Sequence, residues 1–169
     1  MSTHELSLFD SVAATAAQMP AVAFTEPDDD WVPVLFMEDS EGNQATMPIE
    51  MFMQNEQTKN LLTDMIIPAA IKNFKARTVV MVLSVWRSTL PPDVDWQDRP
   101  TPSEDLDRRE EVMIIEYTAE GVTRSAMAEI IRHENAPPTL AEWDDMGEAS
   151  LSQEGRFVGP IVAAMKRVS

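Results

Sequence analysis

The chain of 169 residues has no cysteine, only five glycines and two histidines, and its first basic residue is Lys59. The absence of cysteine excludes disulfides, thiolate metal sites and a cysteine nucleophile. Neither GxxxxGK[ST] nor GxGxxG occurs, which excludes nucleotide binding through either motif. The amino-terminal residues carry Glu5 and Asp10 where a secretory signal needs positive charge, and no apolar run approaches the roughly 20 residues of a membrane helix. The sequence therefore predicts a soluble, cytoplasmic protein that contacts no membrane.

Negative charge is distributed unevenly along the chain. The formal net charge is −16, and −11 of it lies in residues 1–58, which hold eleven carboxylates and no lysine or arginine. A field of this kind repels nucleic acid and attracts basic surfaces. We therefore expect a basic protein surface as the partner, without direct contact to nucleic acid.

The residue patterns predict a single-domain α+β fold, an antiparallel sheet of four or five strands with helices packed against it. Residues 31–169 would form this domain. Residues 1–30 would precede it as an amphipathic helix at 6–19, ended by Pro20, and an acidic linker. The linker makes the helix an expected arm outside the core.

Strands are expected at 31–38, 44–47, 78–88, 112–118 and 122–132. Residues 78–88 carry apolar side chains on both faces, which is typical of a central strand. Residues 122–132 fit helical spacing equally well, but the short turn before them favours a hairpin. Further helices are expected after an Asn55 cap, beyond a break at Pro68, behind a capping box of Thr139 and Glu142, and at 161–167.

Two acidic clusters are candidates for contact with a basic partner. They are Asp28, Asp29 and Asp30 in the linker, and Glu38, Asp39 and Glu41 around a predicted turn. Carboxylates can ligate hard cations, but the alternating Asp and the glycine of an EF-hand loop are missing. A solvated linker and a turn that uses Asp for backbone reasons are the favoured interpretations. We therefore expect no metal and no other cofactor.

A third candidate group lies near one end of the predicted sheet and comprises Trp86, Arg108 and Arg109. Arginine is suited to bidentate capture of a carboxylate or phosphate. The favoured alternative is that the two arginines close a loop by pairing with neighbouring carboxylates, at about 0–1 kcal/mol per exposed pair. These neighbours are Asp105, Asp107, Glu110 and Glu111.

Ser84-Val85-Trp86, Arg99-Pro100 and residues 103–112 resemble small uncharacterised bacterial and phage proteins in which a strand ending in Trp precedes an RPSxxPxRxEV loop. The resemblance covers about residues 54–132, with Leu106 in place of the second proline. It implies a phage or mobile-element setting, with a virion as the alternative location. It implies no activity.

Three functions remain open from the sequence. The favoured one is a non-enzymatic interaction protein that docks on a basic partner, with mimicry of nucleic acid as one version. The second is a structural or assembly protein that self-associates through residues 6–19, using Leu6, Phe9, Val12 and Met19. The third is a metal-dependent hydrolase with carboxylates from residues 93–111. Catalysis by His133 is disfavoured because no GxSxG elbow accompanies it.

Overall fold

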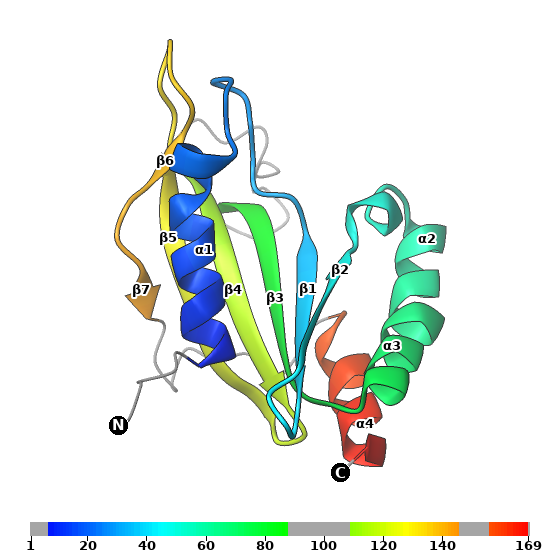
Figure 1. The fold of residues 1–169 in the computed structure, drawn as a ribbon. Coiled ribbons are helices and arrows are strands. Elements are labelled where there is room, and N and C mark those ends of the chain that lie inside the picture. The colour runs from blue at the N-terminus through cyan, green and yellow to red at the C-terminus, as the bar shows by residue number, and fades with distance from the viewer. Residues whose placement is uncertain (1–6, 88–108, 146–155, 169) are drawn as a thin grey trace, which may run out of the picture.

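The computed structural model describes residues 7–87, 109–145 and 156–168. Its strands form one antiparallel sheet and are β1 (Val34–Asp39), β2 (Gln44–Pro48), β3 (Ala76–Arg87), β4 (Arg109–Thr118), β5 (Gly121–Ile131), β6 (Thr139–Leu140) and β7 (Asp144–Asp145) (Figure 1). Its helices are α1 (Leu8–Val22), α2 (Glu56–Leu61), α3 (Ile67–Phe74) and α4 (Val158–Val168), with a 3-10 turn at Glu50–Phe52 and a π turn at Leu62–Ile66. The predicted single-domain α+β fold is confirmed. The described ranges contain seven strands where four or five were expected.

Strand β3 lies in the middle of the sheet, whose order is β2-β1-β3-β4-β5-β6 with β7 beside β5. Val80 lies opposite Phe36 of β1 and Glu116 of β4. Val79 is buried in the core on one face of the sheet, and Val80 in the core on the other. The predicted central strand, covered on both sides, is confirmed.

Strands β4 and β5 form the expected hairpin. Gly121 has φ 121°, a conformation that glycine adopts without a steric penalty. Along β5, Ala126, Ala128 and Ile130 are buried while Glu129 between them is exposed. This alternation has the period of a strand, so the strand interpretation of residues 122–132 is confirmed over the helical one.

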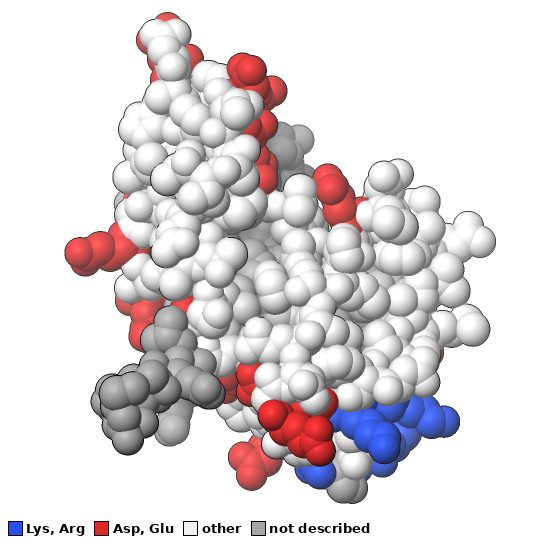
Figure 2. All heavy atoms as spheres, viewed as in Figure 1, with Lys and Arg blue, Asp and Glu red and all other residues white. Residues whose placement is uncertain are grey.

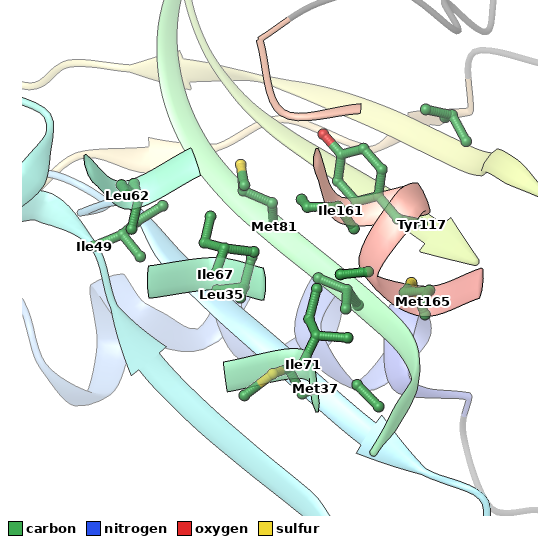
Figure 3. Packing of buried hydrophobic residues seen from close by; sticks show 14 residues of the cluster. Leu35, Met37, Ile49, Leu62, Ile67, Ile71, Met81, Tyr117, Ile161 and Met165 are labelled. Carbon is green, nitrogen blue, oxygen red and sulfur yellow. The ribbon is translucent and has the colours of Figure 1, made fainter. Parts of the chain in front are cut away.

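One face of the sheet is covered by α2, α3 and α4 (Figure 1). Figure 3 shows Ile67 and Ile71 of α3 directed at Leu35 and Met81 of the sheet, with Ile161 of α4 beside them. Each of these side chains is 0% exposed, and full burial of such a side chain contributes about 1.5–3 kcal/mol. Two helical segments thus close this core.

The helical segments before and after Pro68 are joined without a loop. The expected cap is present, since Asn55 Oδ1 accepts from the backbone N–H of Thr58 at 2.9 Å. Pro68 lies in the first turn of α3, and the backbone N–H of Ile67 donates to Leu62 five residues earlier. The break expected at Pro68 is therefore a change in helical hydrogen bonding just before it.

Helix α1 covers the opposite face, and two expectations about it are wrong. The helix extends past Pro20 to Val22. It is also part of the core rather than an arm, because Phe9 and Val12 are buried against the sheet together with Trp31. Apolar burial therefore overrides the helix-breaking proline and the acidic segment that follows it.

The capping-box helix expected from Thr139 does not form. Thr139 and Leu140 make up β6 and pair with Ile131 and Ile130 of β5. Asp144 and Asp145 make up β7, also beside β5. Residues 31–33 likewise lie outside the strand expected from 31, since β1 begins at Val34. None of the helices in the described part of the chain is long and apolar enough to cross a membrane.

Candidate functional site

The first acidic cluster, here called the loop cluster, comprises Asp28, Asp29 and Asp30 between α1 and β1. Asp29 Oδ2 accepts from the backbone N–H groups of Thr25 at 2.8 Å and Glu26 at 3.0 Å. These two hydrogen bonds lower the pKa of Asp29, and the bond from Glu26 has the larger effect. The expected solvated linker is thus an ordered turn, in which Asp28 is exposed.

Arg132, at the end of β5, ties the loop cluster to the sheet. Its guanidinium donates to both carboxylate oxygens of Glu110 on β4, at 3.2 and 2.7 Å. It also donates to the backbone oxygen of Asp29 at 2.7 Å and lies 3.5 Å from the carboxylate of Asp30. Glu110 is the largest cause of a raised pKa of Arg132. The sequence interpretation missed Arg132, because its partners are brought to it only by the fold.

The second acidic cluster, the hairpin cluster, comprises Glu38, Asp39 and Glu41 in the β1–β2 hairpin. Asp39 Oδ1 accepts from the backbone N–H groups of Glu41 and Asn43, both at 2.9 Å. The side chain of Asn43 bonds the other oxygen at 3.0 Å and is the largest cause of a lowered pKa of Asp39. Glu38 accepts from the side chain of Gln44 at 3.0 Å, whereas Glu41 is exposed. The turn role expected for Asp39 is confirmed.

The third candidate group falls partly outside the described residues. Trp86 of β3 is in register with Glu110 of β4, and Arg87 with Arg109, so these backbone positions share one end of the sheet. Arg108 lies outside the described residues. The pairing expected of Arg108 and Arg109 with neighbouring carboxylates lies outside the described side chains, whereas Glu110 makes a bidentate contact with Arg132.

The residues considered for catalysis and metal binding are only partly described. His133 Nε2 lies 3.0 Å from Thr139 Oγ1, and His4 lies outside those ranges. Residues 7–87, 109–145 and 156–168 contain no group of three or more His, Asp or Glu placed to hold a metal ion. Most of the 93–111 segment on which the hydrolase hypothesis rests is not described.

An apolar groove, here called the α1 groove, lies between α1 and β1 and was not expected from the sequence. It encloses about 80 Å³ and is lined by Val12, Thr15, Ala16, Met19, Trp31, Val32, Val34, Phe36 and Val82. Figure 2 shows a broad uncharged surface at the centre of this side of the molecule, with acidic side chains toward its margins.

Basic side chains gather at one corner of the molecule, at the lower right of Figure 2. Lys72, Lys75 and Arg167 line a groove of about 650 Å³ between α3 and α4. Helices α3 and α4 both end near these residues, and positive side chains there offset the partial negative charge of the terminal carbonyls. The basic corner is therefore explained by helix stabilisation.

Ion pairs within the fold occupy several of the carboxylates. Arg124 contacts Asp10 of α1 at 2.9 Å and Asp145 of β7 at 3.3 Å, and its guanidinium lies over the Phe9 ring. Arg156 pairs with Glu56 at the start of α2. Among the exposed carboxylates of the two clusters, Asp30 pairs with Arg132, whereas Asp28 and Glu41 form no ion pair with another described residue. Comparison with known proteins assigns no relatives, since no family model, curated protein or solved structure matches the chain.

Proposed function

We propose that this protein is a non-enzymatic interaction protein that docks on a basic partner through its loop and hairpin clusters. The observation that carries the proposal is that both clusters are fixed in place by their own hydrogen bonds. Asp29 and Asp39 each accept two backbone N–H groups at 2.8–3.0 Å. Carboxylates fixed in this way lose little conformational entropy when a partner binds.

The position of the two clusters supports the same function. Asp30 lies four residues before β1, and Glu38 lies near the end of that strand. A single strand thus separates two negatively charged sites on a rigid sheet. A partner with two matching basic sites would meet both at once, which favours a specific protein surface over a diffuse polycation. A phage setting, suggested by the resemblance of residues 84–112, is retained as part of this proposal.

Two of the four side chains expected to mediate self-association in the assembly alternative are buried. Phe9 and Val12 are 2% and 3% exposed, because they pack on the sheet. Of the other two expected contacts, Met19 is half-buried and Leu6 lies outside the described residues. Self-association through this helix face would require α1 to leave the core, at a cost of about 1.5–3 kcal/mol for each large apolar side chain.

A binding measurement with a basic probe tests the proposed function. We would titrate the protein with a short polylysine peptide at rising salt, and compare wild type with the double variant Asp28→Asn, Glu41→Gln. Since exposed ion pairs contribute about 0.2–1 kcal/mol each, the double variant is expected to bind roughly threefold more weakly or worse. Affinity should fall steeply as salt rises, because the contacts are exposed.

The matched control is Asp64→Asn, Glu129→Gln, which removes the same charge from exposed positions on α2–α3 and on β5. Glu129 lies on the sheet face opposite the core that contains Ala126 and Ile130. Equal weakening by both double variants would show that net charge alone attracts the probe. Either that result or an affinity that does not change with salt concentration would contradict docking through the two clusters.

A further inference from the structure

The α1 groove lies on a part of the sheet that is only half covered. Val34 and Phe36 of β1 project to the same face as Val80 and Val82 of β3, to which they are matched in register. The β3 residues Val80 and Val82 are 0% and 5% exposed, whereas the β1 residues Val34 and Phe36 are only partly buried. Val32, just before the strand, is 43% exposed. Apolar surface thus continues from beneath α1 onto open sheet.

In the described part of the chain, the two faces of the sheet differ in how many helices cover them. The face that buries Met81 carries both the α2–α3 segment and α4, and the face that buries Val80 carries α1 (Figure 1). A second helix beside α1 would lie at the usual interhelical distance of about 8–10 Å, directly over Val34 and Phe36. The open surface therefore has the form of a site for one more helix.

Negative charge lies at both ends of this apolar surface. Asp30, which shares Arg132 with Glu110, immediately precedes Trp31, which lines the groove. Glu38 continues the row of Val34 and Phe36 along the same face of β1, since the register is regular from Val34 to Glu38. The α1 groove is thus apolar in its middle and acidic at its two ends, in agreement with the uncharged centre of Figure 2.

We propose that the α1 groove binds one amphipathic helix of a partner protein, with apolar side chains in the groove and basic residues near both helix ends. The proposal rests on the proposed function and specifies the partner and the place where it docks. At about 3.3 Å per residue, Asp30 and Glu38 are at most about 26 Å apart along the chain. A helix rising 1.5 Å per residue spans that distance in about 17 residues.

The groove determines how such a helix would be oriented. The hollow of about 80 Å³ corresponds to fewer than three waters at about 30 Å³ each, which leaves room for one apolar side chain as an anchor. Further apolar residues at spacings of three and four would lie over Phe36 and Val34. Lysine or arginine near the helix ends would then reach Asp30 and Glu38.

Two synthetic peptides of 18 residues test the inference. One carries leucines at helical spacing and lysines toward both ends, and the other has the same composition in a scrambled, non-amphipathic order. We expect wild-type protein to bind the first at least about tenfold more tightly, and the peptide to gain helical circular dichroism on binding.

Variants on α1 locate the contact. Thr15 is exposed and lines the groove, so Thr15→Arg should obstruct it and repel basic residues, weakening binding of the amphipathic peptide roughly tenfold. Ala17→Arg introduces the same side chain at an exposed α1 position that does not line the groove, and should weaken binding far less. Val32→Ser removes apolar contact without changing charge and should weaken binding roughly threefold. Circular dichroism and Tm of each variant verify folding.

The outcomes separate the inference from the function on which it rests. If both peptides bind equally and salt-dependently, and Thr15→Arg behaves like Ala17→Arg, the groove is not the docking site although docking on basic partners stands. If neither peptide binds at low salt, both proposals are wrong. If the amphipathic peptide binds with undiminished affinity in high salt, the groove binds an apolar segment. The proposed contact of basic residues at the helix ends with Asp30 and Glu38 is then wrong.

Discussion

The indole Nε1 of Trp31 donates a hydrogen bond of 2.8 Å to the backbone oxygen of Ala16, in the middle of α1. Ala16 lies four residues before Pro20, which has no N–H to complete the regular helical bond to that oxygen. Trp31 and Ala16 are both buried, so an oxygen without a donor there would be costly. The indole therefore takes the place of the donor that proline lacks.

Replacing Trp31 should reveal this role. Because Trp31→Phe leaves the buried oxygen of Ala16 without a donor, we expect a loss of about 1–3 kcal/mol in the free energy of unfolding. Pro20→Ala supplies a backbone N–H at the correct position, so the double variant should lose less than the sum of the two single variants. Urea unfolding of all four proteins gives the coupling, which we expect to be about 0.5–3 kcal/mol. Strict additivity would contradict the explanation.

Arg132 should hold the loop cluster in place. Its side chain is 32% exposed, so the ion pairs are partly screened, and we expect Arg132→Gln to lower the free energy of unfolding by about 1 kcal/mol. The clearer effect should be faster hydrogen exchange at the amides of residues 25–31, because the guanidinium contacts the backbone there. Arg77→Gln, at an exposed arginine without an ion pair among the described residues, is the control. Unchanged hydrogen exchange in Arg132→Gln would mean that the turn at residues 25–31 stays ordered without the guanidinium.

Asp39 should make the protein sensitive to acid. Hydrogen bonds from Asn43 lower the pKa of Asp39 in the folded state below the ordinary value of 3.8. Its contribution to stability is therefore present above that value and is lost as pH falls through the lowered pKa. Between about pH 5 and pH 2, the stability of wild type should fall more steeply than that of Asp39→Asn. Parallel curves for wild type and Asp39→Asn would contradict this expectation.

Tyr117 should resist alkaline titration. It is the single tyrosine of the chain, it is 2% exposed, and burial raises its pKa well above the ordinary value of 10. Since the folded state disfavours the phenolate, stability is intact below that value and falls as pH rises above it. Tyrosinate absorbance should therefore appear together with the loss of far-ultraviolet circular dichroism. If tyrosinate absorbance appeared near pH 10 while the circular dichroism stayed unchanged, the Tyr117 ring would be accessible to solvent in the folded protein.

Much of the fold could be read from local patterns. The two-sided apolar run around Val80 identified the central strand, and the turn before Gly121 identified the hairpin. The side-chain cap at Asn55 was also expected, because a cap depends on residues adjacent in sequence. The candidate site was only partly predictable. The acidic clusters are visible in the sequence, whereas the α1 groove is formed by side chains of α1 and β1 with Trp31, Val32 and Val82, which meet only in the folded chain.

The failures share one cause. Thr139 and Glu142 have the residue types of a capping box, yet strand pairing with Ile131 prevails. Pro20 is a stop signal, yet the helix continues because Trp31, distant in sequence, bonds the orphaned oxygen. In each case a contact beyond the local helical segment outweighs a local preference of about 1–3 kcal/mol or less.

The amino-acid sequence by itself determined the excess of negative charge, the strand and helix periods and the turns, because these depend on residue type and on neighbours a few positions away. Only the tertiary structure decided that α1 joins the core, that Arg132 holds the loop cluster, and that an apolar groove lies between acidic ends. The physical reason is that burial and hydrogen bonding are properties of surfaces brought together, and the sequence alone does not specify which surfaces meet.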